Sequence, residues 1–256
     1  MGKYTGYMIV TDFDGSFAEN GEVSPENAAA VRRFQAEGGL FTIATGRAPD
    51  FILAKRASFL PNAPVVSMNG TYISDPLDID RAVAEFPLDE KGYEDLCSLA
   101  ERSPVKRVVL FGGDRTATTW RPTDPETLRE RFARVPRPWY KGMLVQDEQH
   151  TPQVMALARS LYGDRYELNR SFSEGLELHA KGTGKGECLQ VLRDWAGQTN
   201  LTIIGVGDYE NDLSLIRMAD IGVAVENAAE VLKAAADRVV CKNTDHAIAR
   251  IIEELG

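Results

Sequence analysis

The sequence predicts an α/β protein: a doubly wound parallel sheet whose chain is interrupted by a smaller α+β domain. Near both ends of the chain, short apolar runs alternate with helical patterns, which is typical of parallel strands joined by crossover helices. Between about 77 and 180 the strand-like runs are shorter and more polar. We therefore expect one core domain built from residues 1–79 and 181–256, with an insertion at 80–180.

The first part of the core is predicted to alternate strands and helices. Its first helix is well marked, because Ser24 offers an N-cap, Pro25 stands at the first helical position and Gly38 follows the last turn. The expected elements are a strand at 7–11, a helix at 24–37, a strand at 40–44, a helix at 50–59 and a strand at 64–68.

The same kinds of pattern predict the helices and strands of the insertion and of the rest of the core. Within the insertion we expect helices at 90–102, 125–133 and 151–162, strands at 106–111, 116–120 and 142–146, and an irregular, proline-rich stretch at 134–140. After it we expect a helix at 186–195, a strand at 201–206, a helix at 211–218, strands at 221–225 and 239–241, and helices at 229–236 and 245–255. Trp195 shares a helical apolar stripe with Cys188 and Leu192, so it is predicted to lie in the core.

The composition disfavours several classes of protein. With 38 acidic against 29 basic side chains the net charge is −9, which opposes binding to nucleic acid or to an anionic membrane. No apolar run approaches the roughly 20 residues of a membrane span, and the N-terminal run leads into Asp12 and Asp14 rather than into a signal peptide. The 3 cysteines are too widely spaced for a disulfide framework. We expect a cytoplasmic protein, a monomer or weak homodimer, with no nucleic-acid or membrane partner.

Asp12 and Asp14 stand at the end of the first predicted strand. Residues i and i+2 of a strand point to the same side, so both carboxylates should face one pocket. Two carboxylates that lie so close together repel each other unless a cation or a shared proton offsets the repulsion. Gly15 permits the tight turn that would bring backbone groups near a ligand. Two solvated aspartates in a turn would give the same short pattern.

Two further segments offer groups suited to phosphate oxygens. Thr45, Gly46 and Arg47 follow the strand at 40–44 and supply a hydroxyl, a backbone N–H and a guanidinium. A helix cap would explain the first two equally well. Lys185 lies in a glycine-rich connector that does not match a P-loop, and a solvated lysine is the alternative there.

The apolar run at 201–206 leads to Asp208, with Asn211 and Asp212 close behind it. This segment lacks the glycine and the distal glutamate of an EF-hand loop, so a calcium site of that kind is excluded. A plain capping turn is the alternative interpretation.

The combination of these segments is a more specific signal for function than any one of them alone. Carboxyl ends of parallel strands meet at one edge of the sheet, which is where open α/β sheets bind ligands. That edge would gather negative charge from Asp12, Asp14, Asp208 and Asp212, opposed only by Lys185 and Arg47. Mg²⁺ binds through a few carboxylates together with water and phosphate, so the combined set predicts a Mg²⁺ site.

The ordered set DxDGS, TGR, lysine and GDxxND resembles the haloacid dehalogenase superfamily and, within it, the Cof-type sugar phosphatases of subfamily IIB. The resemblance covers nearly the whole chain, including 66–70, 181–186 and 207–228. Residues 80–180 are similar in length and position to the α+β cap of the C2 type in that group. The resemblance implies a Rossmann-like core and a Mg²⁺-dependent phosphatase that hydrolyses small phosphomonoesters, such as sugar phosphates or similar metabolites.

The resemblance also implies a role for each motif residue. Asp12 would be the nucleophile that forms an aspartyl-phosphate. Asp14 would be the general acid and base, and its backbone carbonyl would touch Mg²⁺. Asp208 would be the other direct metal ligand, with Asp212 in support, and Lys185 would be catalytic. The groups expected to hold phosphoryl oxygens are Ser16, Thr45, Gly46, Arg47, Lys185 and Asn211.

Substrate choice is expected to depend on the cap, which by this resemblance closes over the site. Candidate residues are Asn169, Arg170 and Ser171, in a polar loop between two expected strands, and Asn69. A solvated hairpin turn would explain the loop residues equally well. His179 has no partner that the sequence identifies.

Two alternative functions remain open at this point. A phosphomutase would return the phosphoryl group to a sugar instead of to water, and the same motifs serve both reactions. A catalytically silent regulatory or binding protein would be expected to lack Asp12 or Lys185, and both are present.

Overall fold

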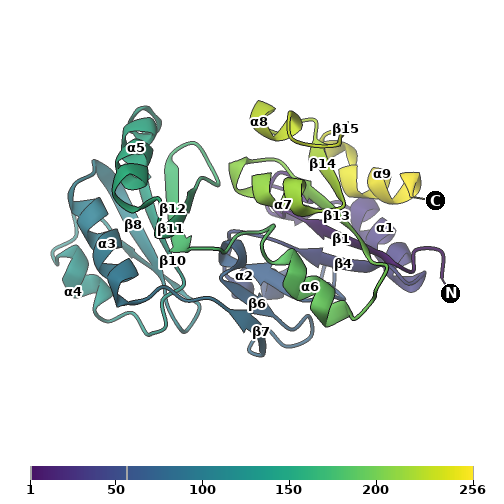
Figure 1. Cartoon of the computed structure of the whole chain (residues 1–256), viewed down its shortest axis with the longest axis horizontal. Helices are drawn as coiled ribbons and strands as arrows, with labels where there is room; N and C mark the ends of the chain where they lie inside the picture. The colour runs from purple at the N-terminus through teal and green to yellow at the C-terminus, as the bar shows by residue number, and fades with distance from the viewer. Residues whose placement is uncertain (1, 56, 256) are drawn as a thin grey trace. The chain divides into compact units, whose positions relative to one another are not determined.

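The computed structural model describes residues 2–55 and 57–255, which form two compact units (Figure 1). The core unit comprises the described residues up to Ala84 and from Gly184 onward, and the insertion unit comprises Glu85–Thr183. The chain thus enters and leaves the insertion unit a few residues later than the predicted limits of 80 and 180. Each unit has its own cluster of buried apolar side chains.

A parallel sheet forms the centre of the core unit. Its strands are β1 (Tyr7–Thr11), β4 (Leu40–Ile43), β13 (Thr202–Gly207), β14 (Ile221–Val225) and β15 (Arg238–Val240). The strand order is β15-β14-β13-β1-β4, and each neighbouring pair runs parallel. A parallel bridge between Ala44 and Val66 places β5 (Val65–Ser67) beside β4.

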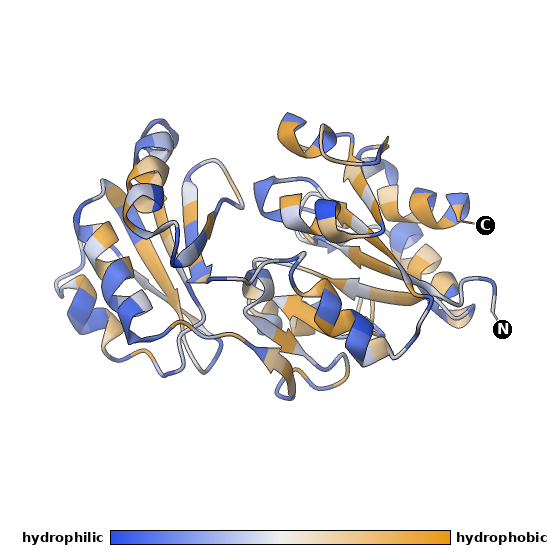
Figure 2. Ribbon diagram, viewed as in Figure 1, coloured by the Kyte–Doolittle hydropathy of each residue, from blue (hydrophilic) through white to orange (hydrophobic). Residues whose placement is uncertain are grey.

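Helices pack on both faces of this sheet, because successive side chains of a strand point to opposite sides. The helices of the core unit are α1 (Pro25–Ala36), α2 (Pro49–Ala54), α6 (Leu189–Ala196), α7 (Leu213–Met218), α8 (Glu230–Lys233) and α9 (Ala247–Glu254). Ile9 packs with Phe34 of α1 and Ile251 of α9, whereas Met8 packs in another cluster with Leu192 of α6. The largely apolar strands are orange in Figure 2. The predicted doubly wound α/β fold is confirmed.

Several element boundaries differ from those predicted. α2 ends at Ala54, and Phe59 enters the apolar cluster from the segment that follows. α9 begins only after His246, whose left-handed backbone (φ 62°) does not fit inside a helix. Trp195 is 40% exposed, so its predicted core position is wrong. It stands in the last turn of α6, two residues before Gly197, at which the helix ends. In the described segments, no helix has the length and apolarity that crossing a membrane requires.

Shorter elements complete the core unit. They are a hairpin of β2 (Ala18–Glu19) and β3 (Glu22–Val23), the strands β6 (Tyr72–Ser74) and β7 (Ala82–Glu85), and the 3-10 turns η1 (Met68–Gly70), η3 (Glu210–Asp212) and η4 (Asn243–Asp245). β5, β6 and β7 form a second sheet, through which the chain leaves the core unit.

The insertion unit combines an antiparallel sheet with helices. Its elements are β8 (Val105–Phe111), β9 (Ala117–Trp120), β10 (Lys141–Gln146), β11 (Tyr166–Asn169), β12 (Gly175–Ala180), α3 (Glu90–Glu101), α4 (Leu128–Phe132), α5 (Thr151–Tyr162) and η2 (Glu148–His150). The strand order is β11-β12-β10-β8-β9, which leaves β9 at an edge. Leu110 and Leu178 of the sheet pack in one cluster with Leu96 of α3. α4 starts later than predicted because Thr127 and Glu130 form a capping box.

Candidate active site

The side chains predicted to carry the chemistry gather at the carboxyl edge of the core sheet. β4, β1 and β13 are parallel neighbours, so Asp12, Thr45 and Asp208, which follow them, meet at this edge. Pairing continues one residue beyond β1, since the Asp12 N–H donates to the Val206 carbonyl at 2.8 Å. The sheet itself therefore fixes the backbone of Asp12.

Lys185 is the central cation of this edge. Its Nζ donates to Asp12 Oδ1 at 2.5 Å and to Asp212 Oδ1 at 2.6 Å. All three side chains are buried. Burial alone would lower the pKa of Lys185, but attraction to the two carboxylates outweighs it and raises the pKa above its ordinary value. The ammonium group therefore stays charged.

Asp212 organises the loop that follows β13. Its Oδ2 accepts the N–H of Asp208 at 3.0 Å and that of Tyr209 at 3.1 Å. Gly207 leaves the room this requires, because a Cβ there would lie 2.4 Å from the Asp212 Cβ. Gly207 was not among the predicted site residues, although its place directly before Asp208 was the available signal.

Asp12, Asp208 and Asp212 form a group that could hold a metal ion. Each offers one carboxylate oxygen, and these atoms lie within 4.8 Å of one another. Burial, and then the charge of Asp212, raises the pKa of Asp208 to about 7. Burial also raises the pKa of Asp12, against the opposing effect of Lys185. A hard divalent cation would offset this crowded charge through oxygen ligands, so the donor set fits Mg²⁺.

Asp14 and Arg47 form a separate ion pair. Arg47 donates through Nε to Asp14 Oδ2 at 2.7 Å and through Nη2 to Oδ1 at 3.0 Å, and its guanidinium lies 4.1 Å from the ring centre of Phe51. The Asp14 carboxylate is therefore not gathered with the other three, contrary to expectation, because Arg47 holds it. That its carbonyl touches a metal stays a prediction. The Arg47 N–H donates to Thr45 Oγ1 at 3.1 Å, which closes the turn around Gly46.

The other core candidates are linked to one another. Ser16 is buried and donates to Asp208 Oδ1 at 3.2 Å. The Asn69 N–H donates to the Thr45 carbonyl at 2.9 Å, and Asn69 Oδ1 accepts from Asn211 Nδ2 at 3.3 Å. Asn69, predicted as a specificity residue, is thus built into the core site, where its backbone adopts the left-handed conformation (φ 56°).

The candidates in the insertion unit have partners within that unit. Asn169 ends β11, and its Nδ2 lies 3.1 Å from His179 Nε2. Ser171 donates to Glu177 Oε2 at 2.5 Å. Arg170 lies between them in the β11–β12 loop. This arrangement gives His179 the partner that the sequence did not identify.

A buried polar layer on the insertion sheet was not predicted. Lys141 of β10 pairs with Glu177 of β12 at 2.7 Å, and both side chains are 2% exposed. His179, two residues further along β12, is fully buried. Burial lowers its pKa to about 4, against the opposing effect of Glu177, so the ring is neutral near pH 7. The available signal was the alternation of polar Glu177 and His179 with apolar residues in one run.

The contribution of His179 to stability should be lost as the pH drops below about 6.5, while the raised pKa values of Asp12 and Asp208 act in the opposite direction. The unfolded chain binds a proton at His179 near the ordinary pKa of 6.5, whereas the folded chain resists until about 4. This contribution is complete above pH 6.5 and amounts to a loss of roughly 2 kcal/mol at pH 5. In urea unfolding, the free energy of unfolding at pH 5 relative to pH 7 should be about 2 kcal/mol lower for the wild type than for His179→Gln. An equal change in both proteins contradicts the assignment.

The fold and the site define a class of hydrolases with a buried lysine and aspartates at the carboxyl edge of a doubly wound sheet. Residues 9–252 match the haloacid dehalogenase-like hydrolase family. The chain therefore belongs to that family, and the predicted Cof-type membership is confirmed.

Similar proteins cover almost the whole chain. The 5-amino-6-(5-phospho-D-ribitylamino)uracil phosphatase YcsE of Bacillus subtilis is 24% identical, over 96% of this chain and 94% of its own length. A crystal structure of a haloacid dehalogenase-like hydrolase from Bacteroides thetaiotaomicron is 26% identical, with a TM-score of 0.78 over 99% of this chain and 100% of that one. The subclass IIB sugar phosphatase BT4131 shares the fold, with a TM-score of 0.78, 20% identity, and coverage of 98% of this chain and 99% of that one.

Proposed function

We propose that the protein is a Mg²⁺-dependent phosphatase that hydrolyses a small phosphomonoester, such as a sugar or polyol phosphate, through an aspartyl-phosphate on Asp12. The observation that carries this proposal is the buried pairing of Lys185 with Asp12 and Asp212, beside Asp208. Phosphoryl transfer requires mainly positioning and neutralisation of charge, and this edge of the sheet offers both. The relative from B. subtilis is named as a phosphatase.

Asp12 supplies the nucleophile. One of its carboxylate oxygens forms a bond to phosphorus while the bond from phosphorus to the ester oxygen breaks, and water then displaces the carboxylate to release phosphate. Covalent catalysis divides one difficult displacement into two easier ones. Lys185 keeps Asp12 oriented, since its ammonium binds Oδ1 at 2.5 Å.

Asp14 is the proposed general acid and base. Protonated, it gives its proton to the departing ester oxygen; ionised, it accepts a proton from the attacking water. The bidentate pair with Arg47 fixes the orientation of this carboxylate. In this proposal Arg47 acts on Asp14 and not as a principal phosphate ligand.

The charge on the transferred group is met by cations and by hydrogen-bond donors. Mg²⁺, held by Asp12, Asp208 and the Asp14 carbonyl with Asp212 in support, would neutralise negative charge on the phosphoryl oxygens. The protein groups proposed to hold those oxygens are Ser16, Thr45, Gly46, Lys185 and Asn211. Donors fixed in advance are effective here because they need little reorganisation during the reaction.

We propose that the insertion unit selects the substrate, with Asn169, Arg170 and Ser171 as candidate contacts. The partner would be a small phosphorylated metabolite. A cytoplasmic location, a monomeric or weakly dimeric state and the lack of nucleic-acid or membrane partners stay predictions.

Purified protein is expected to release phosphate from p-nitrophenyl phosphate and from members of a phosphometabolite panel when Mg²⁺ is present. EDTA should abolish the release and excess Mg²⁺ should restore it, because the acidic group then regains its counter-charge. Turnover that is unchanged by EDTA argues against the metal assignment.

The panel also separates the alternatives. A phosphomutase would convert a phosphosugar into an isomer and keep the label from its phosphoryl group. A silent binding protein would turn over no panel member while still binding Mg²⁺.

Gly15→Ala is expected to lower phosphate release about 100-fold, because a shift of the order of 1 Å at the site has that effect. A Cβ at position 15 would lie 2.4 Å from Asp208 Oδ2, and the backbone there is left-handed (φ 84°). Gly197→Ala is the matched control, since Gly197 also has a positive φ (61°) but a Cβ there has nothing within 4 Å. Both variants should lose about 1–2 kcal/mol of stability, and only Gly15→Ala should lose activity. Equal activity in both would contradict this.

A further inference from the structure

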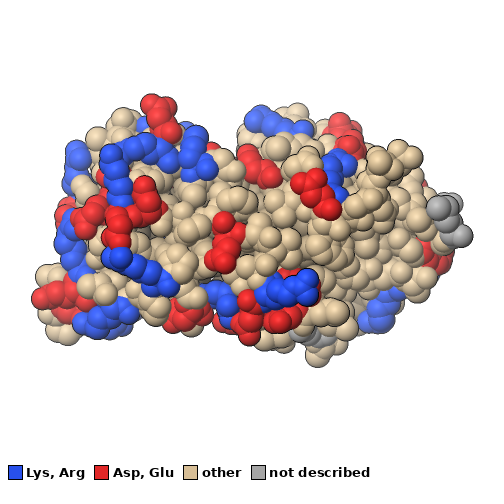
Figure 3. All heavy atoms as spheres, turned by 60° about the horizontal axis from the view of Figure 1, so that its bottom comes forward, with Lys and Arg blue, Asp and Glu red and all other residues tan. Residues whose placement is uncertain are grey.

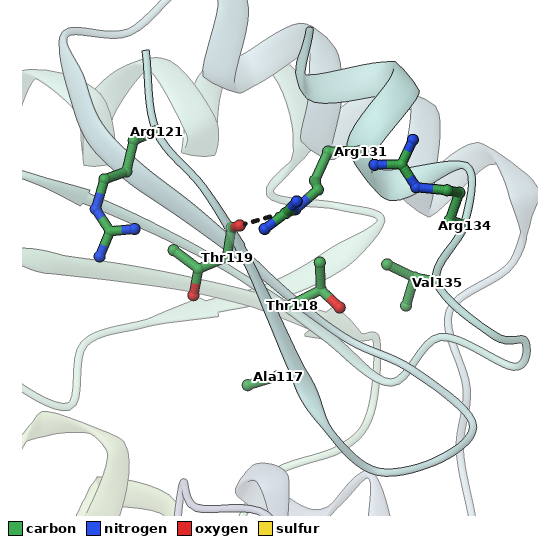
Figure 4. Close-up of a pocket in the computed structure, with 7 residues that line it drawn as sticks. All are labelled: Ala117, Thr118, Thr119, Arg121, Arg131, Arg134 and Val135. Carbon is green, nitrogen blue, oxygen red and sulfur yellow. Dashed lines mark hydrogen bonds between the residues drawn. The ribbon is translucent and has the colours of Figure 1, made fainter. Parts of the chain in front are cut away.

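The insertion unit contains a cavity that the proposed reaction does not use. Its volume is about 430 Å³, and it lies between the edge strand β9 and the end of α4. Its lining residues are Ala117, Thr118, Thr119, Arg121, Arg131, Arg134 and Val135 (Figure 4). The charged side chains among them are all arginines.

Two of these arginines are held in place by one carboxylate, that of Glu126. Glu126 Oε1 accepts from Arg131 Nη1 at 2.8 Å, and Glu126 Oε2 accepts from Arg134 Nη2. Hydrogen bonds from both arginines lower the pKa of Glu126, so it stays ionised. Arg131 Nε also donates to the Thr119 carbonyl at 3.3 Å, as Figure 4 shows. The two guanidinium groups are thus oriented before any ligand arrives, and each keeps further N–H donors.

Arg121 adds a third cation. Its backbone is fixed by the hydrogen bond from its N–H to Asp124 Oδ2 at 2.9 Å. Its guanidinium has no ion pair or hydrogen bond with any residue that the structure describes. In Figure 4 Arg121 stands on one side of Arg131 and Arg134 on the other. Glu126 offsets one of the three charges. Asp124 lies beside the Arg121 backbone. Glu130, which caps α4 together with Thr127, interacts with both Glu126 and Arg134.

On the face that Figure 3 draws, most basic side chains lie beside acidic ones. The lining of this cavity itself contains three arginines and no acidic residue. Guanidinium groups present several donors in a fixed fork that matches phosphate oxygens. Thr118 and Thr119 of β9 also belong to the lining of the cavity. A carboxylate ligand would offer fewer acceptors to so many donors, so a tetrahedral oxyanion is the better match.

We propose that this cavity is a second binding site for a phosphate group, carried either by orthophosphate or by a phosphorylated metabolite. The site is built by the insertion unit alone and does not depend on the chemistry proposed for Asp12. Its volume leaves space for a small organic group attached to the phosphate.

Trp120 provides a local signal for the test. Its indole N–H donates at 2.8 Å to the carbonyl of Glu126, whose carboxylate binds Arg131 and Arg134. The chain has 3 tryptophans, so ¹H–¹⁵N spectra resolve few indole signals, and Trp120→Phe assigns the one needed. Orthophosphate titrated into the whole protein should shift this signal to saturation. Sodium chloride at the same ionic strength should not.

Arg121→Gln and Arg134→Gln should each raise the dissociation constant for orthophosphate roughly fivefold to tenfold. In the double variant the titration should no longer reach saturation. Arg102→Gln is the matched control, because Arg102 is an exposed arginine of the same unit outside the cavity lining. It removes the same charge and should leave the constant unchanged.

Glucose 6-phosphate, titrated into Asp12→Asn so that it is not consumed, separates the two sources. Tighter binding than orthophosphate assigns the site to a metabolite, and weaker binding assigns it to orthophosphate. The proposal is overturned if Arg121→Gln/Arg134→Gln leaves the titration unchanged, if Arg102→Gln weakens it as much, or if sodium chloride reproduces the shift.

Discussion

Asp12→Asn is expected to reduce the rate of phosphate release by at least about four orders of magnitude. An amide oxygen is a poor nucleophile towards phosphorus, and the substitution also removes a charge from the group that would bind Mg²⁺. Release of phosphate from the best panel substrate, measured at saturating Mg²⁺, tests this directly. The Asp14 carboxylate is already paired with Arg47 through two hydrogen bonds.

The same variant should keep its fold. Burial raises the pKa of Asp12, so its charge opposes folding, and Lys185 still has Asp212 as a partner when that charge is removed. The midpoint of urea unfolding should therefore be equal to or higher than that of the wild type. Asp194→Asn is the control, since Asp194 is an exposed carboxylate on α6 that bonds Gln190 and should affect neither property. Substantial phosphate release by folded Asp12→Asn would contradict the assignment of Asp12 as the nucleophile.

Lys185→Met is expected to affect both activity and stability. The lysine is fully buried and bridges Asp12 and Asp212 at 2.5 and 2.6 Å. Removing one partner of a buried ion pair leaves charge without compensation and destabilises by about 3–5 kcal/mol. Phosphate release should fall at least about 10³-fold, as for other fixed donors to a transition state. Urea unfolding and the phosphate assay measure the two effects.

The loss of stability in Lys185→Met should become smaller as the pH falls. Without the ammonium, protonation of a buried carboxylate removes the charge that opposes folding, so acid favours the folded variant over its unfolded chain. Unfolding free energies of variant and wild type should therefore differ more at pH 8 than at pH 5. Lys181→Met is the control, because Lys181 is 53% exposed in its pair with Glu167 at 3.2 Å and should change stability by less than about 1 kcal/mol. If both lysine variants lose the same stability, burial of the ion pair is not the cause.

The fold class was predictable from local patterns, because a buried parallel strand and a capped helix each leave a signature within a few residues. Ser24 illustrates this, since its hydroxyl accepts the Asn27 N–H at the start of α1 as predicted. The first and last residues of the helices were less predictable, because capping interactions and contacts with other parts of the fold determine where a helix begins and ends. α4 begins after Thr127, where the Thr127–Glu130 capping box lies, and not at Pro125 as predicted.

For the site, the sequence by itself determined which residues reach the carboxyl edge of the sheet, because Asp12, Thr45 and Asp208 each follow a predicted parallel strand and such strands end at one edge. The tertiary structure alone decided how their charges pair. Spacing along the chain cannot show that Lys185 binds Asp12, 173 residues away, or that Arg47 holds Asp14 apart from the metal group. Electrostatic partners depend on distance and burial in space, which only the folded chain defines.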